Sequence, residues 1–133
     1  MNSKQIRYTL DCMLRNVGIN YFVLAADEFY NLNLTLIKNT TIIICNIDPS
    51  WLAGRHWICI YIDQQSKIYD FFDSYGQEVT SYGSFFTSLL KFRPIYNTMT
   101  IQSSFSNICG QYCLLFCYYK KLGYSMQSFD NKL

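Results

Sequence analysis

Apolar residues near the N-terminus recur every three or four positions, as they do on one face of an α-helix. They are Ile6, Leu10, Met13, Leu14 and Val17. Ser3 is available to cap such a helix, and Gly18 follows its last apolar position. The pattern predicts that the chain opens with an amphipathic helix.

Three segments in the middle of the chain have the composition of β-strands. Residues 40–47 (TTIIICNI) are β-branched and apolar, which predicts a buried strand. Residues 56–63 and 67–73 are strand-like runs on either side of the polar residues 64–66. These two runs predict a β-hairpin.

The second half of the chain combines helical patterns with one short extended run. Residues 79–92 have a helical pattern, and residues 99–102 fit a short strand. Residues 109–122 (CGQYCLLFCYYKKL) are apolar nearly all round, and the two lysines and Gly123 at their end suit a helix C-terminus. Because a helix so apolar belongs at the centre of a fold, we expect an α+β fold in which this helix packs against an antiparallel sheet.

Length and composition indicate a single globular domain. The 133 residues (15.7 kDa) fit one domain, residues 1–133, and a chain that is 50% hydrophobic and only 15% charged is not intrinsically disordered. The longest apolar run, residues 113–119, is far shorter than the ~20 residues that span a bilayer, so we expect no membrane segment. The N-terminus lacks the continuous hydrophobic segment of a secretory signal, which predicts an intracellular protein whose six cysteines are reduced.

Charge is distributed unevenly along the sequence. Residues 1–78 carry six basic and eight acidic residues, a net charge of −2, whereas residues 79–133 carry five basic residues and one acidic residue, a net charge of +4. The basic half is either an ordinary solvated surface or a face that binds nucleic acid weakly.

His56 is the only histidine, which makes it the first candidate for a general base at neutral pH. A hairpin centred on the peptide bond between Gln64 and Gln65 places His56 directly opposite Asp73. Opposed side chains of an antiparallel pair are close enough for a carboxylate to bond an imidazole nitrogen. The alternative is an ordinary surface pair at the end of a strand.

Cys109 is placed where the apolar helical stretch begins. A thiol at a helix N-terminus has a lowered pKa, because unpaired backbone N–H groups and the helix dipole stabilise the thiolate. Gly110 would allow another chain to approach the sulfur closely. Gln102 is a side-chain donor that could stabilise a developing oxyanion together with the backbone N–H of Cys109, unless it is a plain surface residue.

The remaining cysteines fit a different role. They lie on predicted helices and strands and are expected to be small buried hydrophobic residues; they are Cys12, Cys45, Cys59, Cys113 and Cys117. The spacing C-x3-C-x3-C and the single histidine do not fit a zinc site, so we expect no metal.

Three segments together resemble the catalytic blocks of adenain, the maturation protease of adenoviruses, and of its clan, which includes the Ulp-type SUMO proteases. They are residues 54–57 (GRHW), residues 71–76 (FFDSYG) and the pattern Gln102-x6-Cys109-Gly110. The order His, acid, Gln, Cys and the spacings within the blocks are similar to those of adenain, and the likeness extends over about residues 5–125. The resemblance implies a papain-like or adenain-like cysteine protease fold.

The resemblance also implies a role for each matching residue. Cys109 would be the nucleophile and His56 its base and later acid, while Asp73 would orient the imidazole and Gln102 would line the oxyanion hole. On the substrate side it implies that Gly54, Trp57 and Gly110 border the substrate, with Trp57 beside a narrow channel for glycine-containing backbones.

The sequence departs from adenain in three respects. The acid is Asp73 where adenain has Glu, and the chain ends about where the adenain catalytic helix is left behind. No cysteine lies between Cys59 and Cys109, so the disulfide by which adenain captures its activating peptide has no anchor here. The catalysis implied needs no cofactor, and activation by a peptide or by nucleic acid is an open expectation.

Three hypotheses of function follow. The first is a monomeric thiol endopeptidase that cleaves capsid or core precursors of a virus or virus-like element at glycine-containing sites, in the virion or the host nucleus. The second is a deconjugating protease for ubiquitin-like or SUMO-like modifiers. The third is a virion or binding module that keeps the fold with an inert site.

Overall fold

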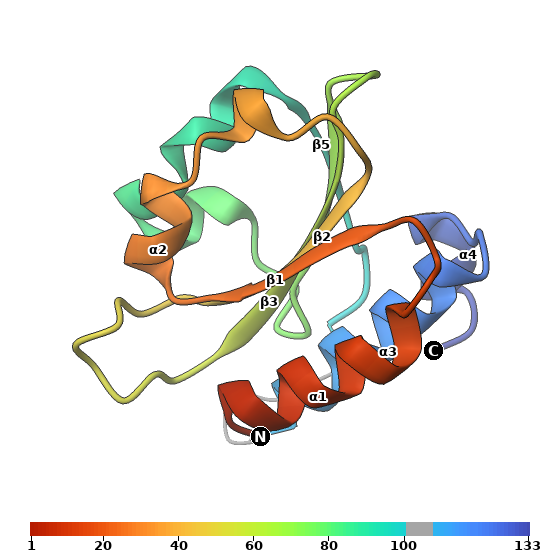
Figure 1. The fold of residues 1–133 in the computed structure, drawn as a ribbon, viewed down its shortest axis with the longest axis horizontal. Coiled ribbons are helices and arrows are strands. Elements are labelled where there is room, and N and C mark those ends of the chain that lie inside the picture. Colours follow the sequence, from red (N-terminus) through yellow and green to blue (C-terminus); the bar gives the residue numbers. More distant parts are fainter. Residues whose placement is uncertain (101–107) are drawn as a thin grey trace.

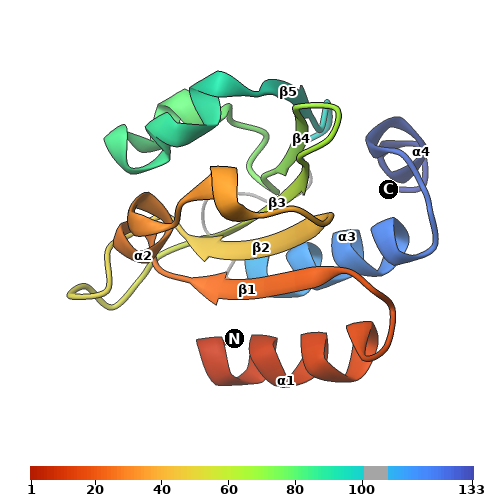
Figure 2. The same ribbon diagram turned by 45° about the horizontal axis from the view of Figure 1, so that its top comes forward.

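A five-stranded sheet lies between two layers of helices in the computed structural model, which describes residues 1–100 and 108–133 (Figures 1 and 2). In chain order the elements are α1 (Ser3–Leu14), β1 (Asn20–Leu24), α2 (Ala26–Asn31), the 3₁₀ helix η1 (Leu34–Leu36), β2 (Thr41–Asn46), β3 (Trp57–Asp63), β4 (Ile68–Phe72), the 3₁₀ helices η2 (Val79–Tyr82) and η3 (Ser84–Lys91), β5 (Arg93–Tyr96), α3 (Cys109–Lys121) and α4 (Met126–Asp130). Helices α1, α3 and α4 cover one face, and α2 with the 3₁₀ helices covers the other. The architecture is α+β, as expected.

The sheet is antiparallel at its centre and parallel at its edges. Strands β2, β3 and β4 pair antiparallel, while β1 pairs parallel with β2 and β5 pairs parallel with β4. The sequence analysis missed both edge strands, which are short; β5 also contains Pro94, a residue that strands accept at sheet edges.

Every residue of β2 is buried, because helices cover both faces of the sheet at this strand. Alternate side chains enter two separate cores. Ile43 and Cys45 join the core beneath α2, whereas Ile42 and Ile44 join the core beneath α1 and α3. This burial explains why the predicted strand is an unbroken apolar run rather than an alternating one.

The opening helix forms as predicted but is capped one residue earlier. The Asn2 side chain accepts a hydrogen bond from the Gln5 backbone N–H, and the Gln5 side chain accepts one from the Asn2 backbone N–H, both at 2.9 Å. This reciprocal capping box replaces the expected Ser3 cap. The helix ends at Leu14, so Val17 lies beyond it.

The predicted hairpin exists, but its register differs from the prediction by two residues. Cys59 lies opposite Phe72 rather than Asp70. The reason is a four-residue loop in which the Asp63 carboxylate accepts the backbone N–H of Gln65 at 3.0 Å and Lys67 adopts a φ of 59°. A shift by two residues leaves every side chain on its predicted face.

The segment predicted as a helix over residues 79–92 consists instead of two 3₁₀ helices. Gly83, with a φ of 85°, separates η2 from η3, so a continuous α-helix does not form. The short strand expected at residues 99–102 does not extend over Met99 and Thr100, and its remaining two positions lie outside the described residues.

Helix α3 packs against β3 and α1, as the apolar pattern predicts, but it is not buried all round. Leu115 and Tyr118 are 38% and 45% exposed. On its buried side Phe116 stacks on Phe72 with ring centroids 5.2 Å apart, and Phe129 of α4 meets both rings edge-on. Within the described ranges, no helix is long and apolar enough to cross a membrane.

Replacing Phe116 by Ala should lower the free energy of unfolding by about 3–5 kcal/mol, because it leaves a cavity among fully buried rings. The neighbouring change Leu115→Ala, on the exposed side of α3, should cost well under half as much. Urea unfolding followed by circular dichroism measures both values. Equal losses would contradict the packing described.

Candidate active site

The structure brings His56, Asp73 and Cys109 together at one end of the sheet. His56 immediately precedes β3, Asp73 immediately follows β4, and Cys109 is the first residue of α3. The His56 Nε2 atom lies 2.5 Å from Asp73 Oδ1, and both side chains are almost fully buried. The predicted pair therefore forms, although the register shift means that the two residues are not directly opposed on the sheet.

The other imidazole nitrogen belongs with the thiol. His56 Nδ1 is buried and, within the described part of the chain, makes no hydrogen bond of ordinary geometry, yet the imidazole and the Cys109 thiol are close enough to change each other's pKa. Burial lowers the pKa of His56, but hydrogen bonds with Asp73 and Cys109 outweigh it and raise the pKa above its ordinary value.

The environment of Cys109 favours its thiolate. Burial opposes ionisation, but hydrogen bonds from the imidazole and from the backbone N–H groups of Trp57 and Gly110 lower the pKa of the thiol. The N–H of Trp57 lies 3.3 Å from the sulfur. The pKa of the thiol is lowered and that of the imidazole is raised, and both directions favour a thiolate–imidazolium pair, the form in which a thiol acts as a nucleophile in acyl transfer.

Both oxygens of the Asp73 carboxylate are occupied. Besides His56, they accept the backbone N–H groups of Tyr75 at 2.9 Å and Gln77 at 3.2 Å, and the hydroxyl of Tyr82. These bonds hold a buried carboxylate with one oxygen aimed at the imidazole. The sequence analysis missed Tyr82, since no pattern relates a tyrosine on η2 to an acid nine positions earlier.

Asn97 fixes the backbone of Asp73. Its side chain accepts the Asp73 N–H at 2.9 Å and donates to the Asp73 carbonyl at 2.8 Å, as a neighbouring strand would. A second donation from Asn97 reaches the Met99 carbonyl at 3.0 Å. Asn97 was not anticipated either, because a single Asn after an edge strand gives no signal in the sequence.

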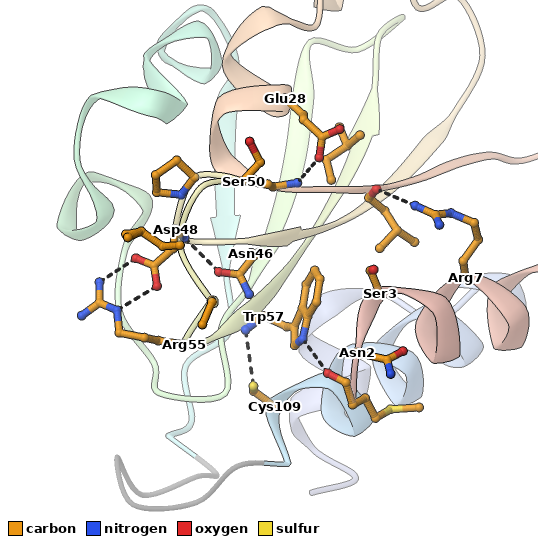
Figure 3. A pocket seen from close by; sticks show the side chains of 18 residues that line it. Asn2, Ser3, Arg7, Glu28, Asn46, Asp48, Ser50, Arg55, Trp57 and Cys109 are labelled. Atoms are coloured by element: carbon orange, nitrogen blue, oxygen red, sulfur yellow. Dashed lines mark hydrogen bonds and ion pairs between the residues drawn. The ribbon is translucent and has the colours of Figure 1, made fainter.

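A cavity of about 520 Å³ opens beside the sulfur (Figure 3). The start of α1 forms one wall and the loop between β2 and β3 forms another, with Trp57 and Cys109 at its end. The Trp57 indole donates to the Met1 carbonyl at 3.2 Å, so the start of the chain helps to fix the indole ring.

The residues predicted to border the substrate lie in different surroundings. Trp57 and Gly54 line the cavity. Gly54 has a φ of 87°, and a Cβ there would come within 2.6 Å of the Asn46 amide. Gly110 is instead buried beneath Met1, Ile6 and Trp57, with Met1 Cβ 3.4 Å from where its own Cβ would be.

Gln102 lies outside the described residues, so its predicted role stays a prediction.

Four of the five other cysteines are buried, as expected. Burial raises the pKa of the thiols of Cys45, Cys59 and Cys113, which keeps them protonated and inert. Cys12 is an exception to the prediction, since it lies exposed on α1. All six thiols are free, and among residues 1–100 and 108–133 no three His, Cys, Asp or Glu side chains gather as a metal site requires.

Comparison with solved structures identifies the fold. The chain is similar to the pS273R protease of African swine fever virus, with a TM-score of 0.68, 17% identity and coverage of 97% of this chain and 60% of that chain. The selenomethionine form of that protease has a TM-score of 0.68 and 18% identity, and the match covers 98% of this chain and 61% of that chain. The SUMO protease Ulp1 was solved with its catalytic cysteine oxidised to a sulfinic acid. It has a TM-score of 0.64 and 16% identity, and the match covers 95% of this chain and 68% of that chain.

The chain thus spans about three fifths of the length of the pS273R protease. No protein-family model matches the sequence, and no curated protein does at a significant level. The likeness inferred from the three motifs is confirmed at the level of the fold: the protein has the α+β fold of the pS273R and Ulp1 cysteine proteases.

Proposed function

We propose that the protein is a cysteine endopeptidase that uses Cys109, His56 and Asp73. The observation that carries this proposal is the buried imidazole held between a carboxylate and a thiol at a helix N-terminus. Nε2 of the ring faces the carboxylate, and the thiol of Cys109 interacts with the same ring, which is the arrangement that nucleophilic catalysis by a thiol requires.

In the first step the Cys109 thiolate attacks the carbonyl carbon of the scissile peptide bond, and a carbon–sulfur bond forms. The oxygen becomes an oxyanion, for which the Cys109 backbone N–H and the Gln102 side chain are the proposed donors. The carbon–nitrogen bond then breaks as the His56 imidazolium gives its proton to the leaving amine. The product is a thioester on Cys109 and a neutral imidazole.

In the second step water hydrolyses the thioester. His56 takes a proton from the water as its oxygen attacks the acyl carbon, and the carbon–sulfur bond breaks to release the carboxylic acid. Asp73 stays hydrogen-bonded to His56 and stabilises the imidazolium. The catalysis uses only side chains and backbone groups of this chain, and no cofactor is part of it.

The substrates proposed are capsid or core precursors of a virus or virus-like element, cut at glycine-containing sites that pass Gly54 and Trp57; Gly110, being buried, is not part of this path. Similarity to a protease of African swine fever virus supports a viral setting, and with it a virion or host nuclear location. We expect the protein to be a monomer. If a peptide activates it, or nucleic acid bound through residues 79–133, we expect the activator to act on this same site.

The alternative is a protease that removes ubiquitin-like or SUMO-like modifiers, which similarity to Ulp1 supports. A SUMO-like protein with a C-terminal electrophile separates the two. Labelling of Cys109 by that probe, together with failure to cleave viral precursors, would favour the deconjugating activity. An inert binding module is disfavoured, because inertness gives no reason to hold a buried imidazole between two ionisable partners.

Cys109 should be the thiol that reacts first with iodoacetamide, at a pH where an ordinary free thiol is protonated, because its pKa is lowered. In the background Cys12→Ser, which removes the exposed competitor, mass spectrometry should find the label on Cys109. Cys109→Ala should abolish cleavage of a peptide library, whereas Cys12→Ser should leave cleavage unchanged. The proposal would be refuted if iodoacetamide labelled another cysteine before Cys109, or if the Cys109→Ala variant still cleaved the peptides.

Activity should have a bell-shaped pH dependence, falling in acid as the thiolate is protonated and in base as the imidazolium loses its proton. Asp73→Asn removes the negative partner of the imidazolium, so the pKa of His56 should fall and that of Cys109 should rise. The pH range of activity should therefore become narrower at both its acidic and its basic limit. The loss in kcat/KM should be roughly a hundredfold smaller than the loss for Cys109→Ala or His56→Ala; an unchanged profile would contradict the role of Asp73.

A further inference from the structure

The turn after β4 supplies more than the carboxylate. The Gly76 N–H donates to the Asp73 carbonyl at 2.8 Å, which closes a tight turn over residues 73–76. Gly76 has a φ of 76°, and a Cβ there would collide with the Thr100 hydroxyl. Thr100 donates to the Tyr75 carbonyl at 3.3 Å. Hydrogen bonds at both the backbone N–H and the carbonyl of Tyr75 therefore fix its position.

The Tyr75 ring lies flat on the imidazole. The two ring centroids are 3.8 Å apart, and the ring planes differ by only 6°. The edge of the imidazole is already occupied. Its Nε2 atom faces Asp73, and the Cys109 thiol is the other partner of the ring. Tyr75 thus covers a face of the same ring whose edge the catalytic partners use.

Stacking of this kind has two physical consequences. A cation is attracted to the face of an aromatic ring, so the tyrosine favours the imidazolium over the neutral imidazole. It also opposes tilting of the imidazole out of the plane in which it meets both partners. Among residues 1–100 and 108–133, the other groups that face His56 include Asp73, Cys109 and, with its ring centroid 6.2 Å away, Tyr82 of η2.

We propose that Tyr75 is a positioning residue of the active site, whose ring fixes the plane of His56 and stabilises its protonated form. The inference deepens the proposed protease function and rests on it. Tyr75 itself does not titrate with the site, because burial and the charges of Cys109 and Asp73 raise the pKa of its hydroxyl. The ring face, rather than the hydroxyl, is the active feature.

The test compares Tyr75→Leu and Tyr75→Phe in the Cys12→Ser background. Leu keeps bulk and every backbone hydrogen bond of the turn but removes the aromatic face, whereas Phe keeps the face. In mildly acidic solution, iodoacetamide should alkylate Cys109 about two- to tenfold more slowly in Tyr75→Leu, and the pH–rate profile should narrow. Tyr75→Phe should restore the original profile. In peptide cleavage the Leu variant should lose kcat with little change in KM.

Tyr8→Leu is the matched control, since it removes a 72% exposed tyrosine from α1, and it should behave like the unchanged protein. Urea unfolding should give similar stabilities for all variants. A Leu variant with the original profile would overturn the role of Tyr75, and so would a Phe variant as slow as Leu. If iodoacetamide did not alkylate Cys109 rapidly in the unchanged protein, that result would instead refute the protease function itself.

Discussion

The whole site depends on the contact of one buried imidazole with the carboxylate of Asp73 and the thiol of Cys109. Burial disfavours the cation, because the protein interior solvates charge less well than water. Asp73 and Cys109 supply the opposing interactions, and their hydrogen bonds with His56 leave its pKa raised in spite of burial. Without these two partners, burial alone would lower the pKa of the imidazole. The chemistry therefore follows from a balance between desolvation and two hydrogen bonds.

That balance explains why the surroundings of Asp73 are so densely bonded. A carboxylate aimed at an imidazole could also rotate, and its hydrogen bonds with Tyr82 and with the backbone N–H groups of Tyr75 and Gln77 leave it little freedom to do so. Asn97 then fixes the Asp73 backbone from the neighbouring edge of the sheet. The 3₁₀ segments that replace the expected helix have a function here, since η2 brings Tyr82 to the carboxylate.

The sequence predicts the parts of this structure that local patterns determine. The strand at β2, the hairpin and the start of α3 follow from periodicity and composition, and with them the candidates His56, Asp73 and Cys109. The register was wrong because an Asp63 turn and the left-handed Lys67 lengthen the loop, a choice that residue pairing alone does not decide. Tyr75, Tyr82 and Asn97 were missed because each acts through a tertiary contact with no spacing rule. The exposure of Cys12 was missed because α1 presents that position to solvent.

Helix α3 shows how position along one helix shifts the pKa of two thiols in opposite directions. Cys109 and Cys113 are one turn apart on the same helix, and both are buried. The pKa of Cys113 is raised well above its usual range because burial meets no compensating donor, whereas Cys109 has the imidazole and two backbone N–H groups. Only the first turn of a helix leaves its N–H groups unpaired, so the proposed nucleophile lies at the end of α3 where a thiolate is favoured. The fold then needs only to bring a histidine to it, and the antiparallel centre of the sheet does so by placing the start of β3 beside the end of β4.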